Sequence, residues 1–307
     1  MTARQPESVT RAWLPIDWAC LAYVTVASVA LARGAAGGAV PRWGWLALAH
    51  VLMVVLVCLA PRARARGGSA RFWGEWYPMF LLAGLYGEVG VLTLNAGLHN
   101  DILIERIEVL VFGSEVSYRW IREMPVVWFS WLVHLCYLSY YLMLFASPAG
   151  LWIIGKREAA RQTIFAIVVT FFVCYVFFLF YPVAGPRYAF DLAHNAATEV
   201  TPARWAHWLL DRGDSWGAAF PSSHVAASVV ATGMAWRHWR PLGLVLVPFT
   251  VGLILAVVYG QFHYAVDALS GLMVAGVVLG VLQLQKVPEE RYAPVTESAV
   301  LEALETS

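Results

Sequence analysis

The chain has 307 residues, of which 60% are apolar and only 13% are charged. An average soluble domain carries about 25% charged residues, so this composition excludes a secreted disulfide scaffold, a disordered chain and a nucleic-acid-binding protein. It indicates an integral membrane protein with several spans. The formal net charge of +1 gives no information about partners. The four cysteines lie in apolar runs without a CxxC pair, and we interpret them as buried apolar residues.

Eight apolar segments are long enough to cross a bilayer, for which a helix needs about 20 residues. The first contains Ala30-Leu31-Ala32, which has the form of a signal-peptide cleavage site. Because Asp17 and Trp18 lie within it and its N-terminal flank is long, we interpret it as a retained span. We therefore expect transmembrane helices at approximately 13–33, 43–60, 76–96, 126–154, 162–182, 217–236, 241–260 and 264–285.

Arginine and lysine gather in the N-terminal segment and in the connections 61–71, 155–161 and 237–240. With eight spans, all of these segments and the C-terminus fall on one side, which the positive-inside rule identifies as the cytoplasm. Dropping one span would divide the basic clusters between the two faces. We therefore expect both termini to be cytoplasmic. The opposite face, which would be periplasmic, extracellular or lumenal, receives the connections 34–42, 97–125, 183–216 and 261–263.

The predicted fold class is an all-α integral membrane protein of about eight transmembrane helices. We expect it to consist of two N-terminal helices with a basic cytoplasmic loop, a six-helix catalytic domain and a flexible cytoplasmic tail, at 1–75, 76–286 and 287–307.

Two long outer connections interrupt the catalytic domain. Residues 97–125 mix charges with aliphatic residues at helical spacing, which predicts an amphipathic helix on the membrane surface. Residues 183–216 carry Trp205, Trp208 and Trp216, which suit an outer lid loop at the membrane interface.

Polar residues form three clusters where predicted spans reach the outer face: Gly185–Tyr188, Phe220–His224 and His263–Asp267. His263 and Asp267 are four residues apart and would share a helix face, so the carboxylate can fix the imidazole tautomer and leave the other nitrogen free to attack. The alternative is a structural His–Asp pair.

The second cluster predicts a helix start, because Pro221 is favoured at the first helical position. Ser222, Ser223 and His224 would then lie in a first turn with free N–H donors, which binds anions. The alternative is a capped helix with an interfacial histidine. Arg187 can grip phosphate oxygens bidentately, or it can simply extend to the interface from a helix end. Together, the three clusters are typical of phosphoryl transfer.

Phe220-Pro-Ser-Ser-His224 and His263-x-x-x-Asp267 resemble the second and third motifs of the type 2 phosphatidic acid phosphatase superfamily. That group includes lipid phosphate phosphatases, inositol phosphorylceramide and sphingomyelin synthases, and soluble vanadium haloperoxidases. The resemblance implies a six-helix core, a nucleophilic His263 that forms a phosphohistidine, an orienting Asp267 and a general acid at His224. It also implies that Arg187, Ser222 and Ser223 hold phosphate oxygens, without a metal or other cofactor.

Two cations of the phosphatase branch are absent, because Phe180 and Val257 stand where that branch carries Lys and Arg. Gly185-Pro186-Arg187-Tyr188 and His263-Tyr264 look more similar to the inositol phosphorylceramide and sphingomyelin synthase-like branch. Fewer fixed cations suit a phosphodiester with about one charge. We therefore favour a headgroup phosphotransferase that acts on a membrane lipid, with a polyol or lipid alcohol as acceptor.

The alternatives are a lipid phosphate phosphatase, hydrolysing a monoester such as a phosphatidic acid or prenyl phosphate, and more distantly a non-enzymatic transporter. The ionisable groups gather at one face, whereas a transport route would place them through the midplane. Glu88 is the exception, about 12 Å below the outer end of its span, and either pairs with another helix or forms the floor of the site. The oligomeric state is not determined by the sequence. Possible headgroup or pocket residues are Tyr188, Tyr264, Tyr259, Asn95, Asp101 and Glu88.

Overall fold

A computed structural model describes residues 13–40, 43–94 and 100–284. Within these ranges the chain is helical, apart from its connections and one isolated β-bridge between Val183 and Ala218. The helices are α1 Pro15–Ala36, α2 Trp43–Arg66, α3 Gly68–Thr93, α4 Asp101–Phe112, α5 Val116–Glu123, α6 Val127–Leu138, α7 Tyr140–Ile153, α8 Arg157–Phe180, α9 Pro186–Ala189, α10 Thr201–Gly213, α11 Ser223–His238, α12 Arg240–Tyr259 and α13 Ala265–Leu284.

Five described helices, α1, α2, α8, α12 and α13, are long and apolar enough to cross a membrane. The pair α6 and α7 counts as a sixth span if its 47° bend lies within one crossing. The all-α, multi-pass membrane class is therefore confirmed. The count of eight stays a prediction, since it also requires α3, which buries Glu75 and Glu88, and α11, which has only 16 residues.

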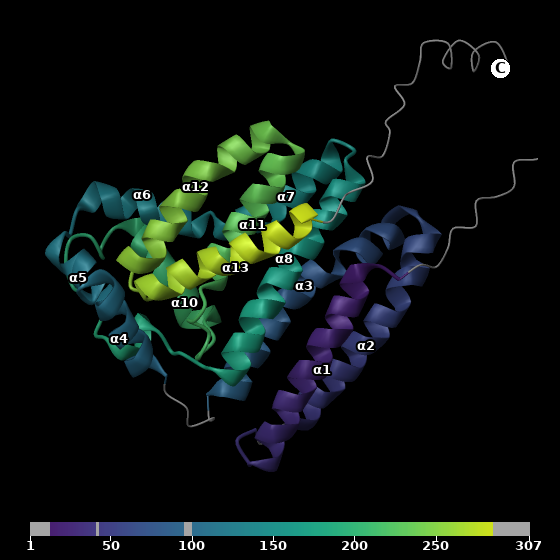
Figure 1. The fold of residues 1–307 in the computed structure, drawn as a ribbon, viewed down its shortest axis with the longest axis horizontal. Coiled ribbons are helices and arrows are strands. Elements are labelled where there is room, and N and C mark those ends of the chain that lie inside the picture. The colour runs from purple at the N-terminus through teal and green to yellow at the C-terminus, as the bar shows by residue number, and fades with distance from the viewer. Residues whose placement is uncertain (1–12, 41–42, 95–99, 285–307) are drawn as a thin grey trace, which may run out of the picture.

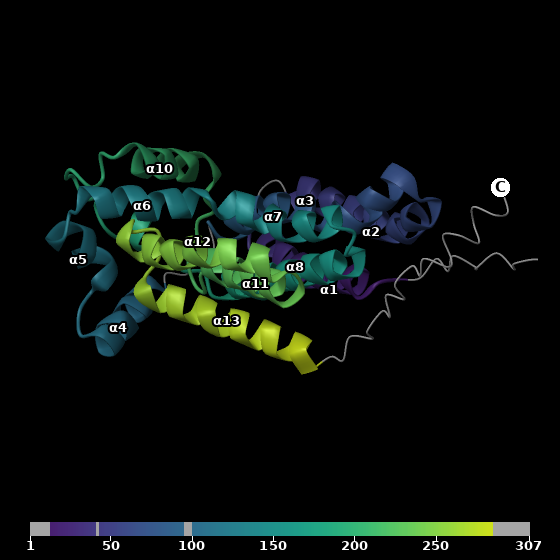
Figure 2. The same cartoon turned by 90° about the horizontal axis from the view of Figure 1, so that it is seen from above.

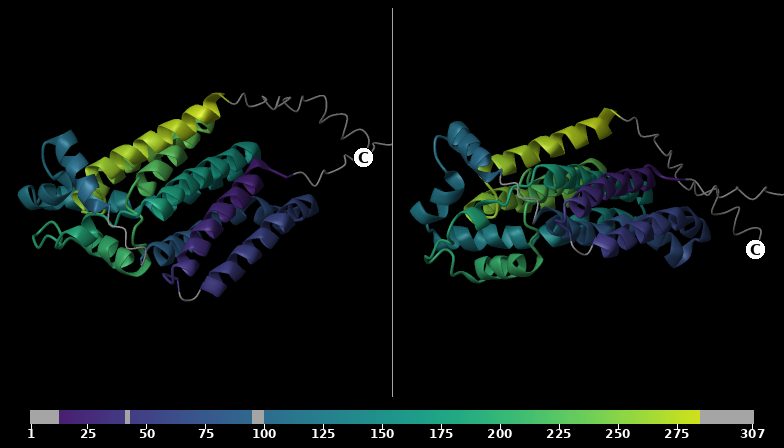
Figure 3. Two further views of the ribbon diagram at one scale, coloured as in Figure 1. Left: turned by 60° about the horizontal axis from the view of Figure 1, so that its bottom comes forward. Right: turned by 90° about the horizontal axis from the view of Figure 1, so that it is seen from below.

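Helix α11 lies at the centre of the domain and packs against α7, α8, α12 and α13. Its surface explains this position, because most of its side chains are small and buried, which lets neighbouring helices approach closely. The helices α1, α2 and α3 lie beside this group and join it through α8 (Figures 1 and 3). The described chain therefore has a central bundle around α11 and an N-terminal group at its side.

The contacts of Asp17 explain how a carboxylate can lie in an apolar segment. Its carboxylate accepts hydrogen bonds from Arg64 of α2 at 2.5 Å and from the Tyr77 hydroxyl of α3 at 2.9 Å. A buried charge needs such partners, so this contact ties together α1, α2 and α3.

Two connections carry more structure than the sequence predicted. The single surface helix expected over 97–125 is divided, within the described residues, into α4 and α5. The reason is Gly113, which ends α4 with φ of 74°, a conformation that glycine adopts without steric cost. The expected lid loop 183–216 contains α9 and α10. Figures 2 and 3 show α10 and α13 on opposite sides of the bundle.

Candidate active site

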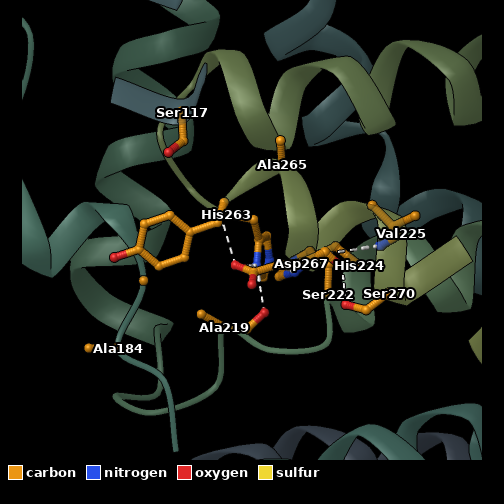
Figure 4. A network of polar contacts seen from close by, with 12 residues as sticks. Ser117, Ala184, Ala219, Ser222, His224, Val225, His263, Ala265, Asp267 and Ser270 are labelled. Atoms are coloured by element: carbon orange, nitrogen blue, oxygen red, sulfur yellow. Dashed lines mark hydrogen bonds and ion pairs between the residues drawn. The ribbon is translucent and has the colours of Figure 1, made fainter. Parts of the chain in front are cut away.

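The three polar clusters predicted from the sequence converge at one end of the bundle. The Nε2 atom of His263 lies 3.3 Å from Nδ1 of His224, and both histidines line one pocket together with Arg187. The pocket holds about 10 Å³, which is room for about one water molecule. Figure 4 shows His224 and His263 gathered with Asp267 and Ala219. The site is therefore formed by residues distant in sequence.

His263 lies in the turn between α12 and α13, before the helix on which we expected it. Its Nδ1 atom is 2.9 Å from the carbonyl oxygen of Ala219. A carbonyl only accepts, so Nδ1 carries the hydrogen, and Nε2 presents its lone pair to the pocket and to His224. The tautomer is thus fixed by a backbone carbonyl.

Asp267 differs from the expectation in its contacts. Its Oδ2 atom lies 3.6 Å from His263 Nδ1, too far for a hydrogen bond. It instead accepts the backbone N–H of Tyr264 at 2.8 Å, because a carboxylate in the first turn of α13 satisfies an otherwise unpaired donor. The fully buried carboxylate still acts on His263 electrostatically, but the predicted direct hydrogen bond is not formed.

The second cluster begins its helix two residues later than predicted. Ser222 is the N-cap of α11, and its hydroxyl accepts the N–H of Val225 at 3.4 Å. Pro221 precedes the helix and is not its first residue. Ser222 and Ser223 are buried and are not on the pocket wall, whereas His224 is. Ser222 therefore caps the helix start, and His224 is the side chain that reaches the pocket.

Arg187 is positioned by a sharply turned loop. Gly185 has φ of 94°, and a Cβ there would lie 2.9 Å from the Cβ of Ala219. The Asp101 carboxylate of α4 accepts the N–H groups of Ala184 at 3.0 Å and Gly185 at 2.7 Å. Asp101, which we expected in the pocket, therefore braces the loop that carries Arg187.

Tyr264 contacts the same Asp101 carboxylate that holds the loop of Arg187. Its hydroxyl donates to Asp101 at 3.2 Å and to Glu105 at 3.0 Å, and its side chain is fully buried. Burial, with these two carboxylates adding to it, holds the pKa of Tyr264 far above its ordinary range. The phenol consequently stays protonated and does not face the pocket.

Arg187 contacts three side chains of the lid that the sequence argument did not single out. It forms an ion pair with Asp211, its Nη1 lies 3.2 Å from Nδ1 of His207, and its Nε lies 3.9 Å from Asp214. His207 and Asp211 are four residues apart on α10 and Asp214 follows the helix, so their spacing was the available signal. The arginine charge is thus already compensated by carboxylates.

Burial and the neighbouring Arg187 lower the pKa of His207 to about 4. The imidazole is therefore neutral near pH 7, and Nδ1 can accept a hydrogen from the guanidinium. Tyr188 donates to Asp214 at 3.2 Å, and burial together with that carboxylate raises the pKa of the phenol to about 12.

The remaining predicted pocket residues lie elsewhere. Tyr259 is fully buried and donates to the carbonyl of Met124 at 2.9 Å. Glu88 contacts His50 of α2 at 2.6 Å, so it pairs with another helix and does not form the floor of the site. Asn95 lies outside the described residues. Tyr86 and Tyr137, which were not among the predicted residues, line the pocket.

Among the described residues, no three histidine, cysteine, aspartate or glutamate side chains are grouped closely enough to hold a metal ion. Metal-independent chemistry stays a prediction.

Comparison with known proteins decides the family. The family model of the PAP2 superfamily matches residues 103–281, more than half of the chain. The chain belongs to the PAP2 superfamily. The matched segment contains Arg187, His224, His263 and Asp267, and it leaves out α1, α2 and α3. No curated protein and no solved structure matches the chain. Membership supports a lipid enzyme of the phosphatase or phosphotransferase type.

Proposed function

We propose that the protein is a metal-independent phosphotransferase that moves a phosphate-linked headgroup between membrane lipids or from a lipid to a polyol, as in the inositol phosphorylceramide synthase-like branch. The observation that carries this proposal is the charge balance of the pocket. Among the described residues that line the pocket, Arg187 is the only arginine or lysine, and Asp211 and Asp214 already lie against it. Such a wall compensates the single charge of a phosphodiester better than the two charges of a monoester.

The position of the missing third-motif cation supports the same preference. Val257 is fully buried, and its carbonyl accepts the backbone N–H groups of Phe262 at 3.0 Å and His263 at 2.8 Å. A residue in this position holds the turn that presents His263 and contributes no charge to the pocket.

The reaction proceeds in two displacements at phosphorus. Nε2 of His263 attacks, a P–N bond forms, and the P–O bond to the leaving alcohol breaks as His224 gives that oxygen a proton. The acceptor hydroxyl then attacks the phosphohistidine, His224 takes the proton of that hydroxyl, and the P–N bond breaks. Arg187 and the positive end of the α11 dipole bind the non-bridging oxygens.

The substrate phosphate enters by separating contacts that close the pocket. A volume of about 10 Å³ is too small for a phosphoester, so the lid carrying Asp211 must release Arg187. Trp205 and Trp208 of this lid are 64% and 52% exposed, as expected of side chains that rest in a lipid interface. We place this end of the bundle at the outer face and both termini in the cytoplasm, on the basis of the basic connections.

The experiment supplies the purified protein with a lipid phosphodiester or a phosphatidic acid in mixed micelles, with and without a polyol or a lipid alcohol. The proposal expects a new lipid headgroup from the diester and little inorganic phosphate from the monoester, both lost in His263→Ala. Rapid release of inorganic phosphate from phosphatidic acid, without transfer from the diester, would instead establish a lipid phosphate phosphatase.

A further inference from the structure

A second polar cluster lies in the N-terminal helices, outside the matched family segment. The hydroxyl of Ser28 in α1 is 2.8 Å from Nδ1 of His50 in α2, and Nε2 of His50 is 2.6 Å from Glu88 in α3. The side chains of His50 and Glu88 are each only 7% exposed. One hydrogen-bonded chain thus crosses three helices.

The depth of this chain is unusual for such groups. With a rise of about 1.5 Å per residue, the three side chains lie roughly 8 to 12 Å from the helix ends at Ala36, Trp43 and Thr93. A hydrocarbon core is about 30 Å thick, so they lie within one leaflet. Ionisable side chains at such a depth are costly and usually have a function.

The hydrogen-bonded series from Glu88 through His50 to Ser28 ends at a hollow of about 520 Å³ between α1 and α2. Ser28 and His50 are polar groups on a wall that is otherwise almost entirely aliphatic, and Glu88 is not part of the wall. Val51 and Val55 on the wall are 58% and 49% exposed, so the hollow opens sideways toward lipid. Its volume is that of a small-molecule site.

The charges of the wall exclude an ionic ligand. No lysine or arginine is among the described residues that line the hollow, and any positive charge on His50 is balanced by Glu88, so a lipid phosphate or carboxylate would have no net counter-charge there. A cationic lipid would find no carboxylate on the wall. The ligand is therefore uncharged.

The hydrogen-bonding groups define its polar part. When His50 is neutral and Glu88 is ionised, Ser28 donates to Nδ1 and can only accept from a ligand. When the His50–Glu88 pair is neutral as a whole, Nδ1–H donates to Ser28, whose own hydrogen is then free for a ligand. An alcohol hydroxyl satisfies either state, because it both donates and accepts.

We infer that α1 and α2 form a lateral binding site for an uncharged long-chain alcohol of the membrane, with the hydroxyl at Ser28 and the chain along the aliphatic wall. The inference does not depend on the proposed function, since the site shares no residue with the pocket around His263.

The test uses the full-length protein in phosphatidylcholine vesicles and a hexadecanol that carries a photoreactive diazirine and an alkyne. The matched control probe is the carboxylic acid of the same chain. We expect the alcohol to crosslink to α1 and α2, to be displaced by unlabelled hexadecanol, and to label them more than the acid does. Equal labelling by the two probes would overturn the inference.

Two variants test the location. Ala47 lines the hollow, whereas the neighbouring Leu48 faces outward and does not, so Ala47→Trp should abolish the labelling and Leu48→Trp should preserve it. Ser28→Ala removes one hydroxyl without filling space and should weaken competition by hexadecanol about three- to tenfold. Identical labelling in both tryptophan variants, or unchanged competition in Ser28→Ala, would show that the polar chain only joins the helices.

Discussion

Two histidines of this protein each lie against a carboxylate in a buried setting, and their surroundings give them different chemistry. His263 uses Nδ1 on the carbonyl of Ala219 and keeps Nε2 for the pocket that contains Arg187. His50 has both ring nitrogens engaged, by Ser28 and Glu88, beside a hollow whose described walls carry no lysine or arginine. We therefore expect a His–carboxylate pair to act as a nucleophile only where one nitrogen faces a pocket that can bind an anion.

The largest expected difference between the two regions is in turnover. His263→Ala should lower transfer activity by about 10³-fold or more, because it removes the attacking atom itself. His50→Ala should change it less than about tenfold, since it lies outside the matched segment. Initial rates of headgroup transfer measure both, with size-exclusion profiles as the folding control. Comparable losses in the two variants would contradict the assignment.

A smaller loss is expected at Asp267. Removing the orienting function of a carboxylate that hydrogen-bonds a catalytic histidine costs about 10⁴-fold. Here the carbonyl of Ala219 fixes the tautomer, and the amide oxygen of Asp267→Asn can still accept the N–H of Tyr264. We therefore expect a loss in kcat of about 10- to 100-fold. A loss near 10⁴-fold would show that Asp267 orients His263 during turnover.

A more modest change should follow from releasing Arg187. Asp211→Asn removes one carboxylate from the guanidinium, so the pocket gains net positive charge. The ratio of kcat/KM for a monoester to that for a diester should rise about three- to tenfold. The control is Glu199→Gln, which also removes one negative charge from the lid connection but lies elsewhere in it. An unchanged ratio for Asp211→Asn would mean that the ion pair with Arg187 does not set the preference.

The smallest expected effect concerns pH and stability. The pKa of His207 falls to about 4 in the folded protein from an ordinary value near 6.5, so between these values the unfolded chain binds a proton that the folded chain does not. Stability should decline as the pH falls from about 6.5 toward 4. His207→Gln, which keeps an acceptor for Arg187, should show a smaller decline in melting temperature between pH 7 and pH 5. An equal decline would place the titrating group elsewhere.

The sequence was sufficient to predict that the clusters around Arg187, His224 and His263 meet at one end, because span order alone decides which ends face the same side. The helical membrane class followed from composition, and the superfamily followed from the resemblance of the motifs at Phe220–His224 and His263–Asp267 to those of a known family. The contacts of Glu88 did not, because its partner His50 lies 38 residues away on another helix.

The carbonyl of Ala219 was also beyond prediction, since a backbone acceptor leaves no trace in residue identity. The spacing of Asp211 and Asp214 from His207 was visible in the sequence, but their contact with Arg187 depends on how the lid folds. Pro221 was predicted to be the first residue of its helix. Ser222 is the N-cap instead, so the helix begins at Ser223 and Pro221 lies before it.

Trapping the covalent intermediate tests most directly whether His263 is the nucleophile. The protein is mixed with a donor lipid carrying ³²P, quenched with alkali, which preserves the acid-labile P–N bond, and analysed by peptide mass spectrometry. We expect phosphorus on the peptide that contains His263, in the wild type and in His50→Ala, and none in His263→Ala. Phosphorus on another residue, or retention of the label in His263→Ala, would contradict this role of His263.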